Sequence, residues 1–71
     1  MKLSARNKLK GRIVSVELGK VMANVKIELA NGDIITAIIT RDSVDGMELG
    51  EGDDVYAVIK STEVMVAKDI Q

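Results

Sequence analysis

The sequence feature that most constrains the fold is an alternating run near the middle of the chain. The stretch VMANVKIELA, residues 21–30, has apolar side chains at every second position: Val21, Ala23, Val25, Ile27 and Leu29. Between the last four of these stand the polar side chains of Asn24, Lys26 and Glu28. A period of two is that of a β-strand, in which successive side chains point to opposite faces. The pattern therefore predicts a strand over residues 20–30 with one buried face.

This run leads directly into a signal for chain reversal. Asn31 and Gly32 follow it, and a second apolar run, DIITAIIT, comes next. An Asn-Gly pair between two strands predicts a two-residue hairpin loop, because both loop residues must accept positive φ angles. We therefore expect residues 33–39 to form a strand that pairs with the one before it.

The segment before the hairpin predicts another strand. LKGRIVSVELG is rich in β-branched and apolar residues over 8–18, and Gly19 is expected to end the strand. Alternation places Ile13 on one face, whereas the opposite face carries Val14, Val16 and Leu18. A glycine inside a strand often marks a bulge or a sharp bend, so we expect one of these at Gly11.

The segment after the hairpin changes its pattern. TRDSVDGMELG breaks the alternation and predicts a short helical turn, which Thr40 or Asp42 can cap. Gly46 and Gly50 are expected to stop this turn. DVYAVIK, residues 54–60, then predicts a fourth strand with two faces: Val55, Ala57 and Ile59 on one, and Tyr56 and Val58 on the other.

EVMVA, residues 63–67, predicts a short fifth strand. Five short strands, with a small helix between the third and the fourth, follow the element order of an OB-like β-barrel. Closing a barrel also removes the strand edges that such apolar strands would otherwise expose. We therefore predict one all-β domain over residues 1–71. An SH3-like barrel is the structural alternative that periodicity leaves open.

The apolar content is high for so short a chain. Hydrophobic residues make up 46% of the 71 residues, and the chain has no Cys and no His. A domain of this size buries only about 60% of the surface that its unfolded chain exposes. With neither disulfides nor a zinc site to staple it, a homo-oligomer is the expected remedy. A monomer with an apolar face for another partner is the competing interpretation.

Several function classes fit the composition poorly. A net charge of −1 and a single aromatic residue, Tyr56, argue against a nucleic-acid surface, which uses basic side chains and several stacking rings. The polar start MKLSARNKLKG predicts no export signal, and no apolar run is long enough to span a membrane, so we expect a cytoplasmic protein. Without His or Cys, and with its acids scattered, the chain is expected to be neither an enzyme nor a metal-ligating protein.

Binding remains, and three polar clusters flank the predicted strands: SARN before the first, TRDS after the third, and KS after the fourth. They offer the donors of Ser4, Arg6, Asn7, Thr40, Ser43, Lys60 and Ser61, with main-chain N–H groups around Ala5 and Ser61. Hydroxyl and amide donors with one or two cations suit a small tetrahedral dianion. The alternative is a frayed N-terminus and an ordinary turn.

The same residues carry a family likeness over residues 3–67. SARNKLKGRIVSVELGKV, ANVKIELANGDIITAIITRDSV and LGEGDDVYAVIKSTEVMVA, in this order, resemble a molbindin, a small Mop-type molybdate-binding protein. The resemblance implies an OB-like barrel and a cytoplasmic homohexamer built as a trimer of dimers. It also implies storage or buffering of molybdate, and of tungstate as an ion of the same shape and charge.

The resemblance further implies oxyanion pockets between subunits. By matching motif positions, the donors are Ser4, the main chain of Ala5, Arg6, Asn7, Lys60 and Ser61, with Thr40 and Ser43 contributed by a neighbouring subunit. No pterin is expected, because the chain has almost no aromatic surface on which a pterin could stack. An OB-type module that binds nucleic acid or protein is the alternative function.

Overall fold

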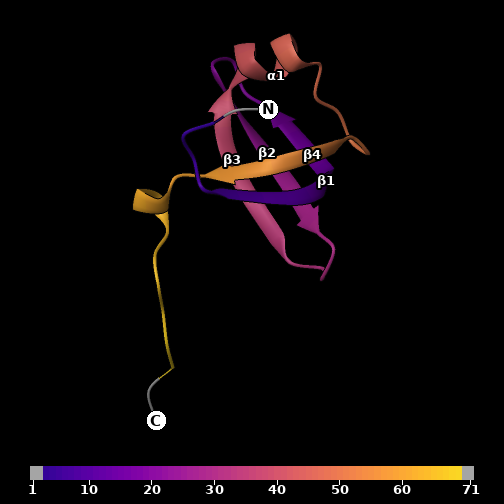
Figure 1. The fold of residues 1–71 in the computed structure, drawn as a ribbon. Helices are drawn as coiled ribbons and strands as arrows, with labels where there is room; N and C mark the ends of the chain where they lie inside the picture. The colour runs from indigo at the N-terminus through magenta and orange to yellow at the C-terminus, as the bar shows by residue number, and fades with distance from the viewer. Residues whose placement is uncertain (1–2, 70–71) are drawn as a thin grey trace.

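The computed structural model describes residues 3–69, so both ends of the predicted domain 1–71 lie outside the described residues. Within them, four strands form one antiparallel sheet in the order β3-β2-β1-β4, which curls into an open half-barrel (Figure 1). The strands are β1 (Asn7–Leu18), β2 (Met22–Leu29), β3 (Ile34–Thr40) and β4 (Asp54–Ile59). One helix, α1 (Arg41–Met47), and one 3-10 turn, η1 (Ser61–Glu63), complete the elements.

The predicted central hairpin is confirmed, but its loop differs. β2 pairs with β3 from Met22–Thr40 to Glu28–Ile34. The N–H of Gly32 donates to the carbonyl of Leu29 at 2.9 Å, and only Gly32 of the two predicted loop residues has a positive φ, 91°. The loop is thus a tight turn followed by a left-handed glycine. Asn31 stabilises the loop through its side chain, because its Oδ1 accepts a hydrogen bond from the N–H of Asp33 at 3.1 Å.

A bulge in β1 overturns the predicted faces of that strand. Ile13 pairs with Ile27, but the next pair is Ser15 with Lys26, so one extra residue, Val14, is inserted. The insertion turns Val16 to the same side as Ile13, which is only 1% exposed. The prediction that Ile13 and Val16 lie on opposite faces was therefore wrong. Of the two features expected at Gly11, a bulge or a sharp bend, the bulge lies at Val14 instead.

Gly11 has another role, at the point where β1 passes from one partner strand to the other. β1 pairs with β4 over residues 7–12 and with β2 over residues 11–18, so the two ladders overlap only at Gly11 and Arg12. A Cβ at Gly11 would lie 2.5 Å from Cγ2 of Ile27 and 2.8 Å from the carbonyl oxygen of Glu28. The absence of a side chain at Gly11 therefore lets β2 pack close to β1 where the sheet curls.

The core lies inside this curl, and α1 closes one end of it. The buried residues are Ile13, Ala23, Val25, Ile27, Val44 and Ala57. Val44 is the buried residue of α1. Thr40, one of the two residues predicted to cap the helix, is its N-cap. The predicted glycine stop was wrong: the helix runs through Gly46 and ends at Met47, and Glu48 takes the left-handed conformation with φ of 52°.

The fifth strand does not form within the chain. After β4 the chain makes the single turn η1, and residues 64–69 then run away from the sheet without strand pairing (Figure 1). The exposed fractions of Met65 and Val66 are 92% and 93%. Without a strand between them, β3 and β4 are the two edges of the sheet. The predicted closed five-stranded barrel is therefore a four-stranded half-barrel here.

The open side of the half-barrel is an apolar cavity of about 650 Å³. Its walls come mostly from the inward side chains of the two edge strands, including Ile35, Ala37, Ile39, Val55, Ala57 and Ile59. The predicted faces of the fourth strand are confirmed, because Ala57 is buried while Tyr56 and Val58 are exposed. In residues 3–69, no helix combines the length and the apolar character needed to cross a membrane.

The crossing at Gly11 leads to a stability prediction. We expect Gly11→Ala to lower the free energy of unfolding by about 1–3 kcal/mol, because the new methyl group overlaps the backbone of β2. Gly46→Ala is the matched control, since a Cβ there meets nothing within 4 Å and the helix gains propensity. Urea unfolding of both variants measures this. Equal stabilities would show that β1 and β2 are not in close contact at Gly11.

Candidate functional site

The ladder between β1 and β4 brings two of the predicted polar clusters together. Its last pair is Asn7 with Ile59, so Arg6, just before β1, and Lys60, just after β4, both lie next to this pair. The Nδ2 of Asn7 also donates to the carbonyl of Ile59 at 3.2 Å. We call this end of the sheet the β1–β4 cluster; its residues are Ser4, Ala5, Arg6, Asn7, Lys60 and Ser61.

The β1–β4 cluster is open to solvent and rich in positive charge. Ser4, Arg6, Lys60 and Ser61 are exposed, and Ala5 is half-buried. Among the described residues, the ion pair within 4.0 Å is that of Arg41 with Asp45, so neither Arg6 nor Lys60 has a carboxylate partner there. Two cations beside hydroxyl groups, without a protein anion to neutralise them, can take an anionic ligand.

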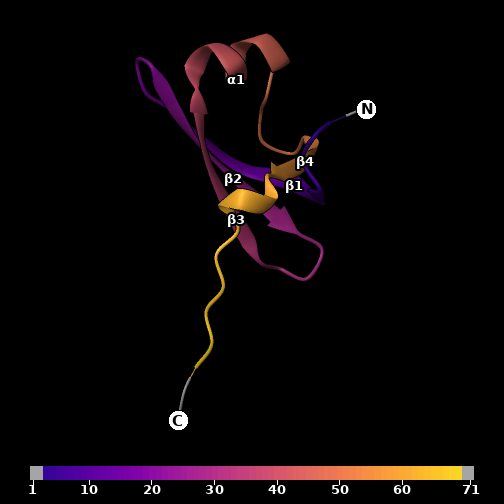
Figure 2. The same cartoon turned by 60° about the vertical axis from the view of Figure 1, so that its left-hand side comes forward.

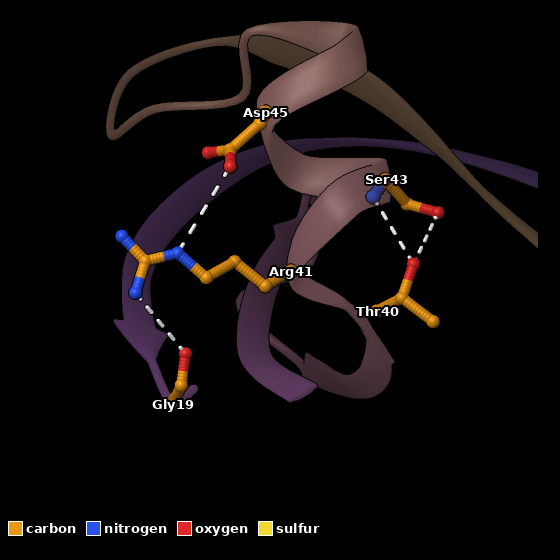
Figure 3. Close-up of polar contacts among 5 residues, drawn as sticks. All are labelled: Gly19, Thr40, Arg41, Ser43 and Asp45. Atoms are coloured by element: carbon orange, nitrogen blue, oxygen red, sulfur yellow. Dashed lines mark hydrogen bonds and ion pairs between the residues drawn. The ribbon is translucent and has the colours of Figure 1, made fainter. Parts of the chain in front are cut away.

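Thr40 and Ser43 form a second polar group at the start of α1, drawn in Figure 3. The N–H of Ser43 donates to Oγ1 of Thr40 at 3.1 Å, which is the N-cap bond. The hydroxyl of Thr40 in turn donates to Oγ of Ser43 at 2.7 Å. The proton of Thr40 is thus engaged, whereas the hydroxyl of Ser43 keeps its own proton for an outside acceptor.

Arg41, the charged residue beside this group, is engaged elsewhere. Its NH1 donates to the carbonyl of Gly19 at 3.3 Å, and its Nε lies 3.9 Å from Oδ2 of Asp45. Figure 3 shows the side chain of Arg41 leading away from Thr40 and Ser43. Arg41 therefore ties α1 to the end of β1, and the Thr40–Ser43 group offers hydroxyls without a free cation.

The two groups lie at opposite ends of β1. Thr40 pairs with Met22, and β2 begins beside the C-terminal end of β1, whereas Asn7 is the first residue of β1. Figure 2 shows the N-terminal segment and the junction of β3 with α1 on opposite sides of the molecule. Within residues 3–69, no hydrogen bond or ion pair joins them. One chain therefore presents two half-sites rather than one pocket.

Sequence reasoning missed one contact that supports the β1–β4 cluster, the hydrogen bond from Asn7 to the carbonyl of Ile59. A main-chain acceptor has no side-chain signature, and its place beside Asn7 follows only from the strand register. Among the described residues, no three His, Cys, Asp or Glu side chains gather closely enough to hold a metal ion.

Comparison with known proteins assigns this chain to a family. Residues 3–66 match the TOBE domain. The chain belongs to the TOBE-domain family. It is 50% identical over 66 residues to molybdenum-pterin-binding protein 3 of Clostridium pasteurianum, an alignment that covers 93% of the chain and 97% of that protein. Within the family it is of the Mop type, so the predicted resemblance to the molbindins is confirmed.

Two solved structures of similar proteins support the assignment to the TOBE-domain family. A molybdate-binding protein from Sporomusa ovata superposes with a TM-score of 0.90 at 41% identity, covering 96% of this chain and 100% of that one. MopII from C. pasteurianum, in an apo form, gives 0.89 at 46% identity, covering 94% and 100%. The mostly-β, OB-like fold is thereby confirmed. Molybdenum-pterin-binding protein 3 and the S. ovata protein are named for binding, in agreement with the prediction that this TOBE-domain chain is not an enzyme.

The cap at Thr40 can be tested through stability. We expect Thr40→Ala to lower the free energy of unfolding by about 0.5–2 kcal/mol, because the N–H of Ser43 loses its acceptor. Thr40→Ser keeps an acceptor oxygen and should retain most of the stability. Thermal melting without any added anion measures both, and an unchanged Thr40→Ala protein would contradict the capping role.

Proposed function

We propose that the protein binds molybdate as a bare tetrahedral oxyanion and serves to store or buffer it in the cytoplasm, with tungstate accepted as well. The observation that carries the proposal is the β1–β4 cluster, where Arg6 and Lys60 stand beside hydroxyl donors with no carboxylate partner among the described residues. The similarity to proteins named for molybdenum or molybdate binding supports the choice of ligand.

Every residue of the cluster except Asn7 offers a donor that suits such an ion. Arg6 presents a planar guanidinium that can reach two oxygens at once, whereas Lys60 acts as a compact charge. Ser4 and Ser61 supply hydroxyl protons, and the small side chain of Ala5 lets the anion approach the main-chain N–H. All of these groups donate, as an ion with only acceptor oxygens requires.

We place the complete pocket between subunits of a homo-oligomer, in which Ser43 and Thr40 of one copy face the β1–β4 cluster of another. The support is geometric, because the two half-sites lie at opposite ends of β1 in one chain. Of the two hydroxyls, Ser43 is the better donor, since the proton of Thr40 is held by Ser43. A hexamer built as a trimer of dimers is the assembly that we propose.

Residues 64–69 supply a means of association. They are extended and unpaired, and they carry the apolar side chains of Val64, Met65 and Val66 into solvent. The half-barrel, in turn, lacks a strand between its two edges and leaves an apolar cavity there. Strand pairing would satisfy both edges and bury both apolar surfaces. We therefore propose that this segment of one copy fills the gap between β3 and β4 of another.

A pterin is not part of the proposed ligand. The single aromatic residue of the chain, Tyr56, lies on the outer face of β4 opposite Lys10, four positions from Lys60. A ring bound at the β1–β4 cluster would thus find no aromatic partner from that cluster. The same scarcity of aromatic side chains disfavours a nucleic-acid surface.

The proposal is tested by equilibrium dialysis of the purified protein against molybdate, with sulfate and phosphate as competitors and bound molybdenum counted by elemental analysis. We expect Arg6→Ala and Lys60→Ala each to weaken binding by about 1.5–3 kcal/mol, as for hydrogen bonds to a charged group. Arg6→Lys should recover only part of the loss, because a point charge replaces the two-pronged donor.

Lys26→Ala is the matched control, since it removes one positive charge from the outer face of β2, remote from the cluster. It should bind molybdate as the unchanged protein does. Equal losses of molybdate affinity in Lys26→Ala and Lys60→Ala would show that binding depends only on the net charge of the protein. Complete displacement by equimolar sulfate would mean general anion binding rather than a molybdate site.

The proposed association through the C-terminal segment makes a prediction about mass. A chain that ends after Glu63 should be monomeric in light scattering at micromolar concentration, because its apolar cavity has nothing to fill it. A chain that ends after Ala67 keeps the apolar segment and should retain the oligomer mass. An oligomer of unchanged mass without residues 64–71 would show that the copies associate through another surface.

A further inference from the structure

Asn7 makes a contact that distinguishes it from the other polar residues of the β1–β4 cluster. Its Nδ2 donates to the carbonyl of Ile59 at 3.2 Å, across 52 positions in the sequence. Among the described residues, this is the side-chain hydrogen bond that joins residues 4–7 to residues 59–61. We infer that Asn7 is a positioning residue, which sets the place of Lys60 and Ser61 rather than contacting the anion itself. The inference rests on the proposed function, in which the β1–β4 cluster binds the anion.

The contact acts on Lys60 through a shared peptide group. The carbonyl of Ile59 and the N–H of Lys60 belong to one planar peptide and point in opposite directions, so holding the oxygen also orients the N–H. On its other side, the carbonyl of Lys60 accepts the N–H of Glu63 at 2.9 Å. Both peptide groups that flank Lys60 are therefore held, and its Cα is fixed between them.

The position of this contact in the sheet adds to its effect. Asn7–Ile59 is the last pair of the β1–β4 ladder, and beyond it the chains separate into residues 3–6 and the turn η1. The last pair of a ladder opens most readily, because only one side of it is supported. A side-chain bond to Ile59 closes the ladder where the donors of the site begin.

The chemistry of the amide also favours an indirect role. An oxyanion offers only acceptors, so the Oδ1 of Asn7 would repel it, and only Nδ2 can approach it. Nδ2 donates one of its two protons to Ile59, and Asn7 is half-buried, whereas Ser4, Arg6, Lys60 and Ser61 are exposed. The exposed residues are thus the ones available to the ligand, and Asn7 supports them.

The test compares Asn7→Ala, and Asn7→Leu as a variant of similar volume, with the control Asn31→Ala. Asn31 is likewise hydrogen-bonded, but in the β2–β3 loop. By calorimetric titration with molybdate, we expect both Asn7 variants to bind roughly two- to twelvefold more weakly, the factor for one net hydrogen bond. The Asn31 variant should bind unchanged. Light scattering verifies that the variants keep the assembled mass.

A double-mutant comparison separates positioning from direct contact. In a Lys60→Ala/Ser61→Ala background, adding Asn7→Ala should cause a much smaller further loss, because the side chains that Asn7 positions are gone and only the main-chain N–H groups remain. A direct contact to the anion would keep its full factor in that background and would overturn the inference. Thr40 lies at the other end of β1, so in a Thr40→Ala background the loss of affinity caused by Asn7→Ala should persist in full.

A second readout does not depend on the ligand. Hydrogen exchange of the Glu63 amide, which donates to the carbonyl of Lys60 at 2.9 Å, should be faster in Asn7→Ala than in the unchanged protein and in Asn31→Ala when followed by NMR without molybdate. Unchanged exchange at Glu63 would overturn the inference even if molybdate binds. If the unchanged protein binds no molybdate, the proposed function fails, and the exchange rate still decides whether Asn7 holds Lys60 in place.

Discussion

The structure depends on one strand that serves two partners in turn. The first half of β1 pairs with β4 and its second half with β2, and the two ladders share only Gly11 and Arg12. β2 and β4 lie on opposite edges of β1, and the close approach of Ile27 to Gly11 falls where their two ladders overlap. The bulge at Val14 then adds the twist that keeps Ile13 and Val16 on the inner side.

The same strand determines what one chain can bind. Because β1 is long and changes partners, its first residues meet the end of β4, while its last residues meet the β2–β3 end that carries Thr40. Donors that the sequence spaces far apart are thus gathered into two groups, one at each end. On the proposed function, anion binding depends on assembly, since the β1–β4 cluster of one copy needs the Thr40–Ser43 group of a second copy to complete the pocket.

Local signals predicted much of this fold. The β2–β3 hairpin, the cap at Thr40 and the faces of β4 all follow from periodicity and short-range chemistry. The bulge in β1 was missed because a single inserted residue is defined by the partner's register, which alternation cannot reveal. The helix end was misjudged because Glu48 takes the left-handed conformation that is more usual for glycine.

The fifth strand shows a different limit. Residues 63–67 have the composition of a strand, but strand formation needs a ladder, and the turn η1 directs this segment away from its own sheet. Prediction of the site divides in the same way: residue types identified the donors, whereas the Asn7–Ile59 contact required the register of β1 with β4.

Choice between oxyanions must rest on geometry, because sulfate and molybdate have the same charge and shape and differ in size. Flexible lysines and arginines alone would adapt to either ion, so discrimination needs donors held at fixed separations. Each half-site has one such restraint, the bond of Asn7 to Ile59 in the first and the bond of Ser43 to Thr40 in the second. Between half-sites of different copies, the separation would be set by how residues 64–69 pack in the gap between β3 and β4. On the proposed function, the strand contact that assembles the protein therefore also sets the size of the ion that it accepts.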